Sequence, residues 1–180
     1  MKKRLKDYVK YYSLEDYLFG EVSRNFYKDH SLSAEDFFAI IIWKSNRSKT
    51  KIVRRLKQEG LTVSEIVRNI RTESREGKLQ YLIGKKIGIG IPIASAILAV
   101  CYPKDFTVVD YRVIASLKAL KEEVEGNPKL KPKAYFDYID KCKKIAKDMG
   151  VSLRQVDKVL WGYDFYEGKN GLKELANKLK

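Results

Sequence analysis

The chain has 180 residues and a formal net charge of +14, from 37 Lys and Arg against 23 Asp and Glu. This length suits one compact domain or two small lobes, and 44% hydrophobic with 33% charged residues is a globular balance, not a disordered one. Two cysteines exclude a disulfide-rich scaffold and a four-thiolate metal site, and a single histidine makes His-based metal clusters and nucleophile schemes unfavourable. We therefore expect no metal and no cofactor. The excess positive charge indicates a polyanionic partner, with nucleic acid ranked before an anionic membrane surface.

Targeting and membrane signals are weak in this sequence. The N-terminus is basic, but no apolar stretch of signal-peptide length follows it. The most apolar run, 87–100, has the length of a core helix and contains Gly88, Gly90 and Pro92, which a simple spanning helix would not favour. We expect a soluble cytoplasmic protein with reduced cysteines that is associated with the nucleoid.

Helix signals recur from the N-terminus onward. Sequences that resemble capping boxes begin at Ser13 and Ser33, and the second precedes a segment that is apolar almost all round, which predicts a buried helix. A basic amphipathic stretch then runs to Leu56 and stops at Gly60, a residue suited to the position after a helix end. A further capping sequence at Thr62 begins another predicted helix.

The second half of the chain continues this helical pattern. The helix from Thr62 is predicted to end near Gly77, and a short helix over 78–85 follows. Beyond a glycine-rich turn, helices are predicted up to Tyr102, from Asp110 to 120, over 135–146, over 153–161 and in a short tail after Gly171. The run 106–109 is strand-like but too short and isolated to build a sheet. The predicted fold class is all-α.

The strongest local motif is the segment 88–94, Gly-Ile-Gly-Ile-Pro-Ile-Ala, between two predicted helices. Two glycines one residue apart permit a tight hairpin with positive φ and leave backbone N–H groups exposed. These groups precede a helix N-terminus, where the helix dipole favours an anion such as phosphate. Lys85 and Lys86 stand directly before the turn and add positive charge. Loop geometry alone also explains such a turn, but in a chain of this charge we favour a phosphate-binding hairpin. Its residues are Gly88, Ile89 and Gly90.

The stretch 82–117 resembles the helix-hairpin-helix DNA glycosylase superfamily (HhH-GPD type). The signature of that superfamily is a Gly-x-Gly hairpin, a helix, a short extended link and an aspartate. Here an Ala-rich helix, 94–98, follows the hairpin, and Val108-Val109-Asp110 supplies the aspartate. Pro92 lies 18 positions before Asp110, the separation at which bifunctional members place their nucleophilic lysine.

Two further segments extend the resemblance over most of the chain. The segment 37–47 is similar to the superfamily's buried helix that leads into a polar, DNA-facing loop. The stretch 135–161 resembles, more specifically, an uncharacterised subgroup of helix-hairpin-helix proteins. Features of that subgroup correspond here to Trp43-Lys44, Asp110-Tyr111-Arg112, Leu153-Arg154-Gln155-Val156-Asp157 and Leu160-Trp161. The resemblance implies a glycosylase-like helical fold: one domain over 1–180, or two small lobes with the hairpin and Asp110 (82–120) at the cleft between them.

Two departures from the superfamily pattern restrict the expected chemistry. Pro92 occupies the place of the nucleophilic lysine, so Schiff-base lyase chemistry through that position is unavailable. The four-cysteine cluster loop of some members is also missing. The resemblance then implies either a monofunctional glycosylase or a DNA-binding frame without the usual reaction.

Asp110 is the candidate catalytic residue. Cleavage of an N-glycosidic bond passes through an oxocarbenium-like sugar, and a nearby carboxylate stabilises the positive charge or activates a water. The target base must first leave the duplex and enter a pocket. The structural alternative is an ordinary N-cap, since Asp110 stands directly before a predicted helix. The two roles are compatible.

Other candidate nucleic-acid contacts flank these motifs. Lys44 and Arg47 are expected to hold backbone phosphates where the buried helix emerges, while Trp43 either stacks on a displaced base or, slightly favoured, ends the core stripe. Tyr111 is a second candidate for the base pocket. Arg112 is expected to pair with phosphate or, equally, with a carboxylate such as Asp157.

Trp161 is predicted to belong to the core. It follows the apolar positions Val156, Val159 and Leu160. We favour this assignment over a base-stacking platform.

These observations favour a monofunctional DNA N-glycosylase, a hydrolase of base-excision repair that removes a damaged or mismatched base with Asp110 and water. The alternative is a non-catalytic helix-hairpin-helix module that binds double-stranded DNA through the same hairpin. RNA binding ranks third, because charge does not discriminate between the two polymers. A membrane-surface role is last, since the basic residues are spread along the chain.

Overall fold

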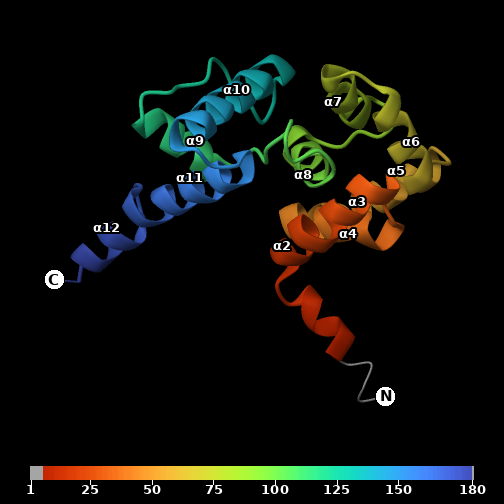
Figure 1. The fold of residues 1–180 in the computed structure, drawn as a ribbon, viewed down its shortest axis with the longest axis horizontal. Helices are drawn as coiled ribbons and strands as arrows, with labels where there is room; N and C mark the ends of the chain where they lie inside the picture. The colour runs from red at the N-terminus through yellow and green to blue at the C-terminus, as the bar shows by residue number, and fades with distance from the viewer. Residues whose placement is uncertain (1–5, 180) are drawn as a thin grey trace. The chain divides into compact units, whose positions relative to one another are not determined.

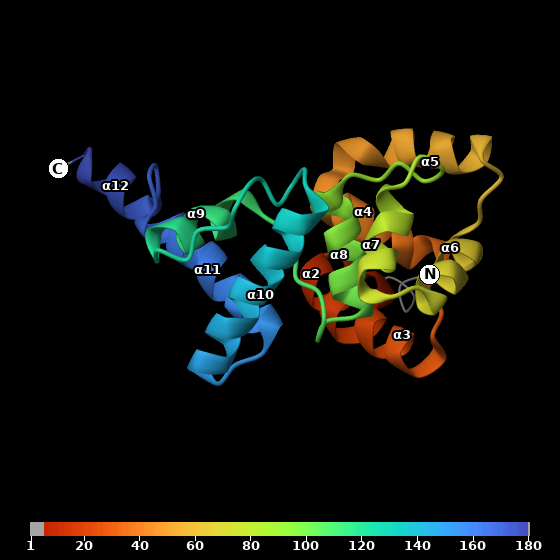
Figure 2. The same cartoon turned by 90° about the horizontal axis from the view of Figure 1, so that it is seen from above.

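The computed structural model of the chain describes residues 6–179, and within that range its regular structure is entirely helical. The predicted all-α class is confirmed. The chain divides into two compact units, Met1–Pro103 (unit 1) and Lys104–Lys180 (unit 2). Figures 1 and 2 show the described helices of each unit.

Unit 1 is built around two apolar helices that pack on each other, α4 (Ala34–Ser45) and α8 (Ile91–Cys101). In α8 every residue except Pro92 is buried, which explains why the sequence of this helix is apolar on all sides. The remaining elements are a 3₁₀ turn (Lys6–Tyr11), α2 (Leu14–Asp16), a π-helical turn (Tyr17–Val22), α3 (Ser23–Asp29), a 3₁₀ turn (Asn46–Ser48), α5 (Lys49–Gln58), α6 (Val63–Thr72) and α7 (Arg75–Ile83). Most of them pack around the pair of α4 and α8 (Figure 2), whereas the first 3₁₀ turn contacts α2.

The capping sequences at Ser13, Ser33 and Thr62 all coincide with helix N-caps, but only two of the three side chains make a capping hydrogen bond. Ser33 accepts a hydrogen bond from the Asp36 N–H at 3.0 Å, and Thr62 forms a full capping box with Glu65. Ser13 is the N-cap of α2, as predicted, but its side chain makes no capping hydrogen bond.

The predicted boundary near Gly77 was also wrong. The helix α6 ends at Thr72, and Gly77 lies inside α7. The Ser74 hydroxyl caps α7 by accepting from the Gly77 N–H at 3.0 Å. A serine cap therefore set this boundary, and the glycine was tolerated within the helix.

Unit 2 contains α9 (Tyr111–Ala119), α10 (Pro132–Met149), α11 (Leu153–Glu167) and α12 (Leu172–Asn177). The helix α11 packs on both α9 and α10, and the Ser152–Gln155 capping box at its start is confirmed. The strand-like run 106–109 is an extended, buried link before α9. It is fixed by two buried tyrosines of α10, because Tyr135 donates to the Thr107 carbonyl and Tyr138 to the Val108 carbonyl, each at 2.8 Å.

Candidate nucleic-acid interface

The hairpin, residues 84–90, joins α7 to α8 in unit 1 and alternates buried with exposed residues. The Ile87 and Ile89 side chains are buried, whereas Gly88 and Gly90 are exposed. Three backbone hydrogen bonds close the turn. The Ile87 and Gly88 N–H groups donate to the Gly84 carbonyl at 3.1 and 2.7 Å, and the Ile89 N–H donates to the Leu82 carbonyl at 3.1 Å. Gly88 has a φ of +67°, a conformation that disfavours any residue with a Cβ. The hairpin predicted from the glycine spacing is therefore present.

Gly90 differs from Gly88 because neither its backbone conformation nor its neighbours among the described residues require a glycine. Its φ of −68° and ψ of 153° are ordinary for any residue, and an added Cβ would meet only the Pro92 Cδ at 3.8 Å. Gly90 is the N-cap of α8 and makes no side-chain capping bond. Within residues 6–179, neither the Gly90 N–H nor the Ile91 N–H donates to a backbone acceptor. Two donors at the positive end of an eleven-residue helix are thus left for an external anion.

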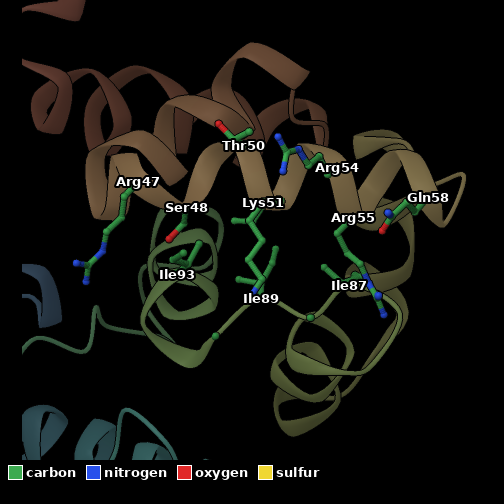
Figure 3. A pocket seen from close by; sticks show the side chains of 13 residues that line it. Arg47, Ser48, Thr50, Lys51, Arg54, Arg55, Gln58, Ile87, Ile89 and Ile93 are labelled. Carbon is green, nitrogen blue, oxygen red and sulfur yellow. The ribbon is translucent and has the colours of Figure 1, made fainter.

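A basic helix, α5, lies across from the hairpin (Figure 3). Between them is a hollow of about 760 Å³ that contains the hairpin residues Gly88, Ile89 and Gly90 in its lining. Four cations line the same hollow and are called the basic face below: Arg47, Lys51, Arg54 and Arg55. The described lining residues include no Asp or Glu, so the charge of the hollow is positive.

The four residues of the basic face differ in their contacts and exposure. Arg55 anchors α5 on the hairpin, because its guanidinium donates to the Lys85 carbonyl and also pairs with Glu59 at 3.4 Å. Figure 3 shows Lys51 extending from α5 toward Ile89, and Arg47 at one end of the lining, beyond Ser48. Arg47, Lys51 and Arg54 are exposed. Arg55 therefore positions the helix, while the charges of the other three are exposed to solvent.

The structure places the predicted contacts of unit 1 as follows. Arg47 lies in the lining with the three hairpin residues, and Lys85 and Lys86 are exposed on the turn just before them. Lys44 is half-buried near the end of α4. Trp43 is also half-buried and meets Phe19 edge-on, with ring centroids 5.5 Å apart, as expected for a residue at the end of a core stripe.

Sequence reasoning missed the four long polar side chains of α5 that line the hollow, although the basic amphipathic character of this segment was evident. Its Ile52 and Leu56 are buried, which turns the intervening polar positions toward the hollow or the solvent. The sequence does not show that this helix faces the hairpin across the hollow. The missed residues are Lys51, Arg54, Arg55 and Gln58.

In unit 2, Asp110 is the N-cap of α9, as the alternative interpretation of this residue predicted. Its carboxylate accepts from the Arg112 N–H at 3.1 Å, and the side chain is half-buried. The link before it is held by Tyr138, whose pKa is raised by burial, so the phenol stays protonated and donates. Asp110 is thus held at a defined place. The predicted cleft between the hairpin and Asp110 stays a prediction.

Arg112 pairs with Asp164 of α11 at 2.9 Å and not with Asp157, which pairs with Arg154. Of the two roles predicted for Arg112, the structure shows a carboxylate pair. Tyr111, the second base-pocket candidate, is exposed at the start of α9, and the Arg112 guanidinium lies 5.2 Å from its ring centroid.

The prediction that Trp161 belongs to the core was wrong. The buried stripe of α11 is Leu153, Val156, Asp157 and Leu160, and Trp161 stands next to it with 41% of its surface exposed. Consecutive residues of a helix point in different directions, so Val159, Leu160 and Trp161 cannot share one face. Val159 is exposed too.

Three comparisons with known proteins were made, and none found a significant match. No family model matches the chain, and neither the curated proteins nor the solved structures contain a significant match. Among residues 6–179, no helix is long and apolar enough to cross a bilayer.

Proposed function

We propose that this protein binds double-stranded DNA and contacts the backbone phosphates with the hairpin and the basic face. The observation that carries the proposal is the pair of donors at Gly90 and Ile91, placed beside a hollow whose charged lining is entirely cationic. A phosphate at the hairpin receives hydrogen bonds from backbone N–H groups and lies near the positive end of α8. Neighbouring phosphates along the strand are within the range of flexible Lys and Arg side chains.

This arrangement supports binding without sequence preference. The hairpin offers backbone groups, which recognise phosphate but carry no information about bases. Long cationic side chains act on the polyanion by displacing counterions, so affinity falls steeply with salt. The resemblance of residues 82–117 to the helix-hairpin-helix superfamily points to the same role for the hairpin.

The test measures binding of a fluorescein-labelled duplex by anisotropy over a series of salt concentrations. Replacing Lys51 and Arg54 with Gln is expected to weaken binding and to reduce the slope of log K against log salt by about 0.9 for each contact removed. A matched control replaces Lys133 and Lys147, two exposed lysines of α10, and changes the net charge equally. Equal effects of the two double variants would show that only net charge matters and would contradict the proposal.

A second candidate function, favoured by the fixed position of Asp110, is monofunctional N-glycosylase activity. The carboxylate is half-buried at a helix N-terminus, after a link that two buried tyrosines hold. With a base extruded from the duplex, such a group would stabilise the oxocarbenium-like sugar and activate water. Pro92 has no amine, so this position forms no Schiff base.

Incubation with duplexes that carry a panel of damaged or mismatched bases, followed by alkali, tests this second function. Strand breaks are expected with the wild type and not with Asp110→Asn, a substitution that keeps the cap because Asn is as good an N-cap as Asp. Borohydride is expected to trap no covalent adduct. If Asp110→Asn cleaves as well as the wild type, or if no lesion is cleaved, the chain is a binding module only.

A further inference from the structure

An exposed aromatic cluster on unit 2 has no role in the proposed duplex contact. It consists of three rings, Tyr111 from α9 with Trp161 and Phe165 from α11, arranged around the guanidinium of Arg112, and is called the aromatic platform below. The Arg112 Cζ lies 5.1–5.2 Å from each of the three ring centroids. Trp161 and Phe165 are stacked, with centroids 5.0 Å apart and planes at 19°.

The rings of the platform remain open to solvent although they contact one another. Trp161 is 41% exposed, Phe165 38% and Tyr111 58%. Large aromatic side chains gain most from burial, so an exposed set of three indicates a surface that a ligand covers. The Asp164 carboxylate, 2.9 Å from Arg112, fixes the guanidinium among the rings, so the platform is ordered before any ligand arrives.

We infer that the aromatic platform stacks unpaired nucleobases of a single-stranded DNA segment. A flat, partly exposed ring system with a guanidinium in it offers stacking and cation–π contact to any base, whatever its hydrogen-bonding edge. The strand that carries the base is an anion, and the chain has a net charge of +14.

The inference rests on the proposed function, because it takes DNA as the partner, but the two use different residues. Duplex phosphates are assigned to the hairpin and basic face of unit 1, and unpaired bases to the platform of unit 2.

The experiment uses the full chain labelled with 5-fluorotryptophan. The chain has two tryptophans, so the fluorine spectrum contains two resonances, and Trp161→Phe assigns them. Titration with oligodeoxythymidylate is expected to shift the Trp161 resonance and to leave that of Trp43 in place. An oligonucleotide of the same length made of abasic sites has the same phosphates and no bases, and it is expected to leave both resonances unchanged.

Affinity measurements on labelled oligodeoxythymidylate supply the second readout. Trp161→Ala is expected to weaken binding by roughly tenfold, the usual scale for the loss of one base–aromatic stack. Tyr163→Ala is the matched control, because Tyr163 lies on the same helix, is 42% exposed and stands outside the platform. Arg112→Lys keeps the charge but loses the planar group, and a several-fold loss is expected.

The outcomes separate this inference from the proposed function. Equal losses for Trp161→Ala and Tyr163→Ala, or equal shifts with the abasic oligonucleotide, would overturn the platform. Duplex binding that fails while the Trp161 shift persists would overturn the proposed function alone. Duplex binding that persists without any Trp161 shift would overturn the platform alone.

Discussion

Replacing Gly90 with alanine, and Gly88 with alanine in parallel, separates the folding of the hairpin from its proposed contact with phosphate. At Gly88 the φ of +67° places an alanine in the left-handed region, which costs about 1–2 kcal/mol, while the nearest atom to the new Cβ is the Lys85 carbonyl oxygen at 4.0 Å. At Gly90 the backbone is extended and the new Cβ meets only the Pro92 Cδ at 3.8 Å. Alanine is a poorer N-cap than glycine, which lowers the free energy of unfolding. It also restricts the unfolded chain, which raises the free energy of unfolding by about 0.4–1 kcal/mol and offsets the loss.

The free energy of unfolding is therefore expected to fall by about 1–2 kcal/mol in Gly88→Ala and to stay near the wild-type value in Gly90→Ala. Duplex affinity, in contrast, is expected to fall in Gly90→Ala. A methyl group on Gly90 stands where a phosphate must approach the Gly90 and Ile91 N–H groups, and loss of one charge-assisted hydrogen bond costs about 1.5–3 kcal/mol, or roughly tenfold to a hundredfold in affinity.

Urea denaturation followed by circular dichroism measures the first quantity, and anisotropy of a labelled duplex measures the second. Gly90→Ala that folds and binds like the wild type would refute the phosphate contact at this residue. A loss of stability in Gly90→Ala as large as that in Gly88→Ala would refute the conformational argument.

Three further predictions concern the helix cap at Thr62 and the two buried thiols. Thr62→Ala removes the hydroxyl that accepts from Glu65 N–H, and we expect a loss of about 1 kcal/mol in thermal or urea unfolding of unit 1; an unchanged midpoint would contradict this. Burial raises the pKa of Cys142 to about 12 and also raises that of Cys101, so neither thiol is expected to react with iodoacetamide at pH 8 until its own unit unfolds, as peptide mass spectrometry would show. The unfolded chain loses these thiol protons near pH 9, whereas the folded chain keeps them. The free energy of unfolding is therefore expected to fall as the pH rises from about 9 toward 12. A free energy of unfolding that is constant or rises over this range would contradict the raised thiol pKa values.

Local signals in the sequence were sufficient for most of the helices. Capping residues act on the backbone within three positions, so Ser33, Thr62 and Ser152 marked helix starts that the structure confirms. The tight turn at Gly88 was predictable for a similar reason, because it depends on the positive φ of that one residue. Where the same local rule failed, as at Ser13, the following helix is a three-residue turn that continues into a π-helical turn.

The residues of the candidate site were harder to predict because their roles depend on partners far along the chain. Arg55 meets the Lys85 carbonyl across 30 positions, and Arg112 meets Asp164 across 52. A single sequence gives no signal for either pair. Trp161 was misassigned for another reason: an apolar run that contains consecutive residues does not by itself say which one faces the neighbouring helix.

The most direct test of the central claim follows the backbone amides of the hairpin by two-dimensional ¹⁵N–¹H NMR while a short blunt-ended duplex is added at low salt. If the hairpin holds the DNA backbone, the Gly90 and Ile91 amide protons shift downfield as they donate to phosphate, together with signals of exposed α5 residues such as Lys51. The Gly88 and Ile89 amides already donate within the hairpin and are expected to change less. Saturable binding that leaves the Gly90 and Ile91 amides unmoved would contradict the claim that this hairpin holds the DNA backbone.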